Sequence, residues 1–91
     1  MNAILKKEIP ISDNFSLSLP KNANILCFKT QNEVPMIWYE FETSEIIKQV
    51  KRKFCIIRTG DMFFKNNLIY IGTILQKEGL FGWHLYEDKN L

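Results

Sequence analysis

Apolar and polar residues alternate with a period of two along much of the chain, and turn-forming clusters interrupt the alternation roughly every eight to twelve residues. The segment 15–19 shows the pattern most clearly, because Phe15, Leu17 and Leu19 alternate with two serines. Such alternation is typical of a β-strand with one buried face. Strands are expected near 3–8, 15–19, 25–30, 35–42, 49–59, 68–75 and 81–86.

The segments 68–75 and 81–86 predict a C-terminal β-hairpin that turns near Gly79. Both segments are rich in β-branched and aromatic residues, and glycine accepts the positive φ that short hairpin loops often require. Both faces of 68–75 are apolar, so we expect this strand to lie centrally in a sandwich or to be covered by a second chain. Gly72 and Gly82 predict a bulge, a bend or a close backbone approach. Strict alternation groups Leu68, Tyr70, Gly72 and Ile74 on one face, and Ile69, Ile71, Thr73 and Leu75 on the other.

The stretch 43–53 carries two conflicting patterns. Ile46, Ile47 and Val50 recur at helical spacing behind Ser44, a residue type that often caps helices. The residues that follow have the composition of a strand, which we expect to begin at about residue 49. The predicted fold class is therefore mostly β, an antiparallel sandwich or small barrel of about seven short strands, and one short helix near 44–50 is left open.

Length and composition limit the function classes. A chain of 91 residues predicts a single domain over 1–91 with a modest core, and its net charge of +2 is too small to indicate nucleic acid by itself. No apolar run approaches the length of a membrane span, so no membrane association is expected. Cys27 and Cys55 have apolar neighbours, which favours buried free thiols over the alternative of a single disulfide.

The sequence offers no catalytic or metal-binding motif. His84 is the one histidine, no Gly-x-Ser-x-Gly element is present, and Cys55 lies in an apolar segment where core packing is the usual role. Cys27, Cys55 and His84 also lack the short spacing of a zinc site. We therefore expect a protein that is not an enzyme, with no catalytic residues, no metal and no cofactor.

Two groups of residues are candidates for ligand binding. Arg58, Thr59 and Gly60 place a basic side chain, a hydroxyl and a flexible backbone at a predicted strand end, where backbone amides can bind an anion. A plain turn, in which Thr59 and Asp61 bond local backbone amides, is the favoured alternative. The second group would line a pocket or a subunit interface, unless its members belong to the core: Trp38, Tyr39, Trp83 and Tyr86, with His84 packed beside them.

Basic residues cluster at the start of the fifth predicted strand. Lys48, Lys51, Arg52 and Lys53 lie close to strand aromatics, a combination by which small barrels bind single-stranded nucleic acid. Acidic residues lie just upstream, and the overall charge is nearly balanced. A solvated face of mixed charge is therefore the favoured interpretation, with nucleic-acid binding as the alternative.

Several features of the chain recur together in one family. The C-terminal block contains Leu68, Tyr70 to Thr73, Trp83, His84 and Glu87, and earlier strands contain Met36 to Trp38 and end in Thr59-Gly60. With these features the chain resembles a family of short phage and prophage proteins of unknown function. The resemblance covers nearly the whole chain and departs from it between 43 and 53. It implies expression in a bacterial cytoplasm and an accessory role in phage infection, and it brings no activity with it.

The favoured hypothesis is a small phage-encoded accessory protein that acts by binding. It would self-associate as a homo-oligomer in the cytoplasm of the bacterial host, and would sequester a host signalling nucleotide or block a host defence protein. The alternatives are a single-stranded nucleic-acid-binding protein of phage replication and a small structural or virion-associated domain. The candidate ligand-binding residues are Arg58, Thr59, Gly60, Trp38, Trp83, His84 and Tyr86, and the alternative nucleic-acid set is Lys48, Lys51, Arg52 and Lys53.

Overall fold

The computed structural model of the protein describes residues 1–45 and 48–91, and within them it contains seven β-strands and one short 3-10 turn. Each predicted strand segment is present, with ends that differ by a few residues. The strands are β1 (Asn2–Glu8), β2 (Asn14–Pro20), β3 (Asn24–Gln31), β4 (Val34–Glu42), β5 (Gln49–Arg58), β6 (Leu68–Gln76) and β7 (Phe81–Asp88).

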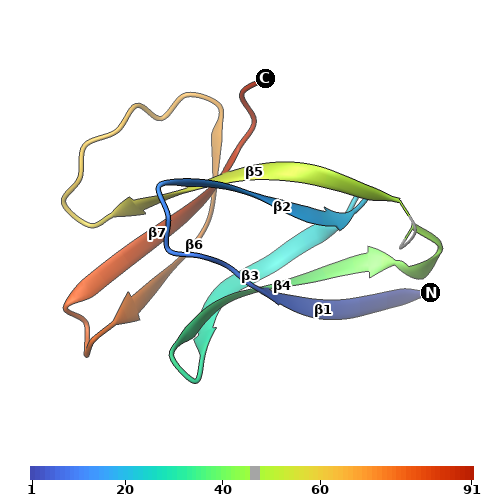
Figure 1. Ribbon diagram of the computed structural model, residues 1–91, viewed down its shortest axis with the longest axis horizontal. Helices are drawn as coiled ribbons and strands as arrows, with labels where there is room; N and C mark the ends of the chain where they lie inside the picture. Colours follow the sequence, from blue (N-terminus) through green and yellow to red (C-terminus); the bar gives the residue numbers. More distant parts are fainter. Residues whose placement is uncertain (46–47) are drawn as a thin grey trace.

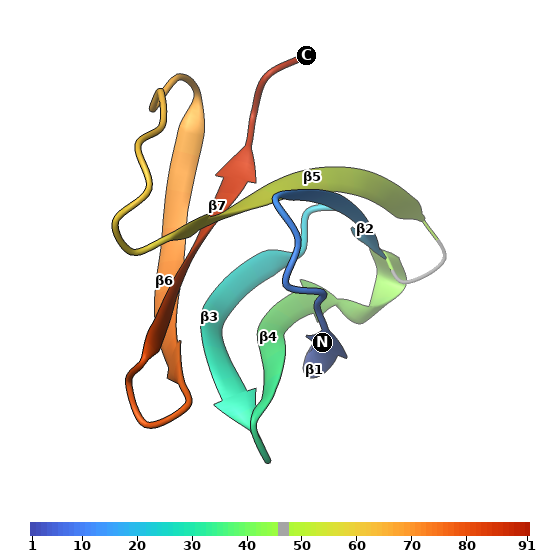
Figure 2. The ribbon, with the colours of Figure 1, turned by 60° about the vertical axis from the view of Figure 1, so that its left-hand side comes forward.

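The strands form two sheets, which Figures 1 and 2 show as separate layers that approach each other where β3 passes β6. The three-stranded sheet has the order β1-β4-β3, and the four-stranded sheet has the order β2-β5-β7-β6. All pairings among the described strands are antiparallel. The predicted mostly β fold, an antiparallel sandwich, is therefore confirmed.

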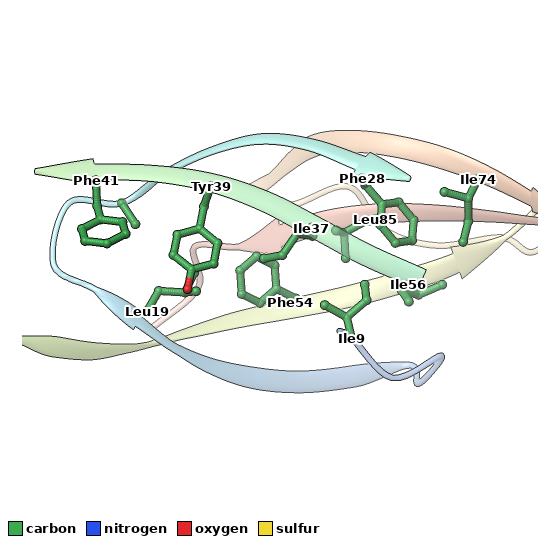
Figure 3. Close-up of a cluster of buried hydrophobic side chains, with 11 residues drawn as sticks. Ile9, Leu19, Phe28, Ile37, Tyr39, Phe41, Phe54, Ile56, Ile74 and Leu85 are labelled. Atoms are coloured by element: carbon green, nitrogen blue, oxygen red, sulfur yellow. The ribbon is translucent and has the colours of Figure 1, made fainter. Parts of the chain in front are cut away.

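The core forms where the inward residues of both sheets meet (Figure 3). Phe54 of β5 and Leu85 of β7 pack in one cluster with Ile37 and Tyr39 of β4, and Phe54 also stacks on Phe15 with ring centroids 5.6 Å apart. Burying each such side chain stabilises the fold by about 1.5–3 kcal/mol. The fully buried apolar cluster comprises Ile9, Leu19, Ala23, Phe28, Ile37, Tyr39, Phe41, Phe54, Ile56, Ile74 and Leu85.

The connection from β4 to β5 begins with a single helical turn. This turn, η1, spans Thr43–Glu45, and β5 begins at Gln49 as predicted. Residues 46 and 47 of the helix left open near 44–50 lie outside the described residues. No helix in the described part of the chain is long and apolar enough to cross a membrane.

A β-bulge in β6 changes which of its residues share a face. The pairing with β7 shifts between Tyr70 and Gly72, so Ile71 is an extra residue on the β6 side. After the bulge, Thr73 lies on the same face as Tyr70, whereas Gly72 faces the other sheet. The expectation from strict alternation, which grouped Tyr70 with Gly72, is therefore wrong beyond the bulge, although the glycine itself predicted an irregularity there.

Gly72 also allows β6 to approach β3 closely. A Cβ atom added at Gly72 would lie 3.2 Å from Cβ of Phe28 and 3.6 Å from its backbone nitrogen. Contacts of 3.2 Å between such atoms are tighter than ordinary van der Waals packing. The predicted close backbone approach is thus confirmed at the point where the edges of the two sheets meet.

Both cysteines are free thiols. Cys55 is buried, as predicted, and burial raises the pKa of its thiol. Cys27 is only half-buried on β3, in the other sheet. The structure therefore has the free thiols that were favoured and not the disulfide.

Candidate functional site

Most of the predicted ligand-binding residues meet at the end of β5. His84 and Tyr86 lie on the outer face of the four-stranded sheet, the face turned away from the other sheet, whereas Arg58 is in register with Trp83 and borders the hollow from the strand end. Arg58, Thr59 and Gly60 at the end of β5 line one hollow of about 260 Å³ together with His84 and Tyr86 of β7. β5 and β7 are hydrogen-bonded neighbours, which brings these distant parts of the sequence together. The other residues lining the hollow are Ile57, Asp61 and Phe63.

His84 is the centre of a hydrogen-bonded row of side chains that crosses three strands. Its Nε2 lies 2.7 Å from the Thr59 hydroxyl, and its Nδ1 lies 2.8 Å from the Thr73 hydroxyl. The Thr73 hydroxyl lies 2.6 Å from the hydroxyl of Tyr70. Because both ring nitrogens have a partner, the row fixes the plane of the imidazole and its position in the hollow.

Thr73 and Tyr70 were not predicted as site residues. Thr73 pairs with His84 across the hairpin. The extra residue at Ile71 puts Thr73 on the same face as Tyr70, so Tyr70 reaches the same row. A turn near Gly79 indicates which strands pair, but the register of the pairing past a bulge is not visible in the sequence. Knowledge of that register would have identified both residues as members of the site.

Gly82 makes room for the Thr59 side chain. A Cβ atom added at Gly82 would collide with the Thr59 hydroxyl oxygen, so the hydroxyl occupies the space above the glycine. The Thr59 amide also donates to the carbonyl of Gly82 at 3.0 Å. The predicted close approach at Gly82 therefore positions one end of the hydrogen-bonded row.

Arg58, Gly60 and Asp61 form a turn in which the arginine and the aspartate pair with each other. The Asp61 amide donates to the Arg58 carbonyl at 3.0 Å, and Arg58 Nε donates to Asp61 Oδ2 at 2.9 Å. The hydrogen bond to Asp61 raises the pKa of the Arg58 guanidinium above its ordinary value. A carboxylate thus occupies the position that an anionic ligand of Arg58 would take, and Thr59 bonds His84 rather than the local backbone that the plain-turn interpretation assumed.

The segment 59–67, here called the crossover loop, covers part of this face. β5 and β6 lie on either side of β7, so the chain must pass over β7 between them. Phe63 packs on Tyr86 with ring centroids 5.5 Å apart, and Tyr86 packs on Tyr70 at the same distance. These contacts place the crossing on the outer face, and Figure 2 shows the loop beside β6 on the side away from β3.

The crossover loop carries two large apolar side chains that are almost fully in water. Met62 is 92% exposed and Phe64 is 93% exposed. On β6, Tyr70 and Leu75 of the outer face are also exposed. These four residues are here called the apolar surface. Neither Met62 nor Phe64 was predicted, because the sequence shows them only as part of a three-residue apolar run in a loop.

The two tryptophans do not join the hollow. Trp38 lies on β4, in the other sheet, between Lys6 and Cys27 of the flanking strands. Trp83 packs against the core, and its indole Nε1 donates to Gln76 Oε1 at 2.8 Å. The core interpretation therefore describes Trp83, whereas His84 and Tyr86 point to the opposite side of the same strand.

The predicted basic cluster is divided between the two sides of β5. Arg52 faces inward, where Nε and Nη2 donate to the two carboxylate oxygens of Glu87 at 2.7 and 2.6 Å, and Nη1 donates to the Ala23 carbonyl at 2.5 Å. The neighbouring lysines, Lys51 and Lys53, are exposed. The structure thus separates Arg52 from the lysines with which it was grouped.

Glu87 is a buried carboxylate, with 6% of its surface exposed. Burial alone would favour its neutral form, but the hydrogen bonds and charge of Arg52, with Lys89 at 3.4 Å, hold the pKa of Glu87 below its ordinary value. The ion pair is therefore charged at neutral pH and ties the inner faces of β5 and β7 to the turn before β3.

The hollow combines several kinds of polar and aromatic side chain. Its side chains supply hydroxyls, an oriented imidazole, an arginine–carboxylate pair and aromatic rings. Within residues 1–45 and 48–91 no group of three or more histidine, cysteine or acidic side chains is placed to hold a metal ion.

Comparisons with known proteins bear on the family alone. Searches of curated proteins and of solved structures gave no match. A family model described as a domain of unknown function, DUF7352, matches residues 1–91. Because that match spans the entire length of the chain, the protein belongs to the DUF7352 family.

Proposed function

We propose that the protein is a phage-encoded accessory protein that acts by binding, self-associates in the bacterial cytoplasm, and blocks a host defence protein. The observation that carries the proposal is the apolar surface, above all the exposure of Met62 and Phe64 on the crossover loop. Contiguous or prominent apolar groups on a soluble protein are typical of interaction sites. The resemblance to phage and prophage proteins supports the origin and the compartment.

The energetic argument rests on what covering these side chains would contribute. Transferring one Met, Phe or Leu side chain from water to an apolar contact stabilises a complex by about 1.5–3 kcal/mol. Phe63, between the two exposed residues, is anchored on Tyr86, which restricts the loop and reduces the entropy lost on binding. Aromatic side chains presented in this way are common binding hot spots.

A protein partner suits this face better than a nucleotide does. The hollow beside the loop has a volume of about 260 Å³, below the usual range for small-molecule sites. Arg58, the basic side chain that would meet a phosphate there, is paired with Asp61. The side chains of Met62 and Phe64 in the apolar surface, by contrast, carry no charged group that another residue already pairs with.

Self-association is tested by size-exclusion chromatography with light scattering at high micromolar concentration. We expect an oligomer for the natural sequence and a monomer for the double variant Met62→Ser/Phe64→Ser. The matched control is Ile4→Ser/Leu26→Ser, which removes two exposed apolar side chains from the other sheet and should leave the oligomer intact. A monomeric natural protein would overturn the self-association.

The host partner is tested by affinity capture from infected cells with the same three proteins. We expect one host protein to be retained by the natural sequence and by the Ile4/Leu26 control, and to be lost with the Met62/Phe64 variant. Equal retention by all three proteins, or retention of nothing by any of them, would contradict the role of the apolar surface.

A further inference from the structure

A second hollow lies at the opposite end of β5, far along the strand from the crossover loop. It has a volume of about 510 Å³ and forms where the turn between β2 and β3 meets the start of β5 and the segment after β7. Its lining includes three basic side chains and two asparagines beside Ala23 and Val50. The residues that line it are Lys21, Asn22, Ala23, Asn24, Val50, Arg52 and Lys89.

Several polar side chains of this hollow are available to a ligand. Within the described ranges, the side chains of Lys21, Asn22 and Asn24 make no hydrogen bond or ion pair with another residue. The Lys21 amide donates to the Lys48 carbonyl at 2.7 Å, which fixes the backbone of this turn against the segment that leads into β5. An ammonium group supplies three donors and an asparagine amide supplies two more, so the rim is rich in donors for anionic oxygens.

The floor of the hollow is already neutralised and fixed. Arg52 uses its guanidinium on Glu87 and on the Ala23 carbonyl, so its charge is balanced by a carboxylate that is 6% exposed. Lys89 lies 3.4 Å from the same carboxylate and keeps more than half of its side chain in water. The ion pair therefore holds Lys89 at the mouth, and the uncompensated charge of the hollow is positive.

We propose that this hollow binds a phosphate-bearing ligand, and that Lys21 and Lys89 contact its phosphate oxygens while the amides of Asn22 and Asn24 donate beside them. The same phosphate chemistry is offered by a free nucleotide and by the backbone of a single-stranded nucleic acid. Arg52 is a positioning residue in this site, because it acts through Glu87 on Lys89. The site is separate from the apolar surface, so it stands or falls independently of the proposed function.

The residues of the predicted basic set lie in different places relative to this hollow. Arg52 supports the floor, whereas Lys48 is not a lining residue and is connected to the hollow only through its carbonyl, which accepts from the Lys21 amide. Lys51 and Lys53 point to the outer face of β5, where they pair in register with Ser18 and Ser16 of β2. The two residues that the proposal depends on most, Lys21 and Lys89, are far apart in the sequence and were not in that set.

The test is fluorescence anisotropy with two probes, a fluorescein-labelled oligothymidylate and a fluorescent adenine nucleotide, over a range of salt concentrations. We expect the natural protein to bind at least one probe, with an affinity that falls as salt rises. For the oligothymidylate, the variant Lys21→Ala/Lys89→Ala should reduce the slope of log affinity against log salt by about 0.7 for each lysine removed. Binding of the oligothymidylate alone identifies a nucleic-acid backbone, and binding of the nucleotide alone identifies a free nucleotide.

The matched control is Lys29→Ala/Lys65→Ala, which removes the same charge from two exposed lysines outside the hollow. We expect it to retain the affinity and the salt slope of the natural protein. Equal weakening in both double variants would show only an effect of net charge and would overturn the site, as would the absence of binding to both probes at low salt. All four lysines are exposed, so thermal unfolding of the Lys29/Lys65 variant should match the natural protein, and the Lys21/Lys89 variant should differ only by the loss of the Lys89–Glu87 contact.

Discussion

The two ends of β5 differ in which side chains are buried and which are exposed to water. At its start, Arg52 turns inward and forms a buried ion pair with Glu87. At its end, Thr59 and His84 keep their hydrogen bonds on the outer face, while Met62 and Phe64 of the crossover loop are exposed to water. A polar network that is buried supports the fold, whereas apolar groups that are exposed cost little to the folded state and are available to a partner. The comparison therefore separates residues that hold the sandwich from residues that are free to bind.

The largest effect is expected from removing the buried carboxylate. Glu87→Gln leaves the Arg52 guanidinium without its anionic partner inside the sandwich, and breaking a buried pair in this way costs about 3–5 kcal/mol. We expect a corresponding loss in the free energy of unfolding, measured by urea denaturation.

The paired variant Arg52→Met/Glu87→Leu is the control for this effect. It removes both charges, so no unpaired ion remains, and it should cost clearly less than Glu87→Gln alone. If the double variant loses more stability than the single one, the ion pair has a net stabilising role that exceeds its desolvation cost.

Acid should weaken the Arg52 end of the molecule first. The pKa of Glu87 is lower in the folded protein than its ordinary value, so the unfolded chain binds a proton at this group more readily. The stability from the ion pair is therefore complete above the ordinary pKa of a glutamate and is lost as pH falls through the lowered pKa.

This pH dependence is measured by urea midpoints at about pH 7 and about pH 3. Asp88, whose pKa is lowered by hydrogen bonds from Asn90, changes in the same direction and remains in both proteins compared. We expect the Glu87→Gln variant to lose less stability between the two pH values than the natural protein. Parallel pH curves for the two proteins would contradict the assignment to Glu87.

A smaller effect is expected at the Thr59 end. Gly82→Ala places a methyl group against the Thr59 hydroxyl, and crowding of this kind costs about 1–3 kcal/mol. The cost should fall in a Thr59→Ala background, because the colliding oxygen is then absent. A double-mutant cycle on the free energy of unfolding measures this coupling, and additive costs would mean that the two side chains do not share the space.

The smallest effect on stability is expected at the apolar surface. Met62→Ser/Phe64→Ser should change the free energy of unfolding of the monomer by no more than about 0.5 kcal/mol, because both side chains are in water in the folded chain. Urea denaturation at low protein concentration measures it. A larger loss would mean that these residues support the crossover loop rather than a partner.

The sequence by itself determined the strands and the fold class. Alternation such as that of Phe15, Leu17 and Leu19 has a local cause, because successive side chains of a strand point to opposite faces. The turn near Gly79 likewise follows from local backbone freedom. Arg58, Thr59 and Gly60 could be grouped for a similarly local reason, because they are adjacent in the sequence.

The tertiary structure alone decided which of those residues meet and which charged side chains pair with an opposite charge inside the protein. The bulge at Ile71 moves Thr73 to the side of Tyr70 and completes the row at His84, and the order β5-β7-β6 sends the crossover loop over that row. The partner of Arg52 lies far along the chain, so a basic cluster in the sequence became one buried ion pair and separate exposed lysines. Local patterns record what each residue prefers, whereas strand order and register are set by packing over the whole molecule, and the binding surfaces depend on that order and register.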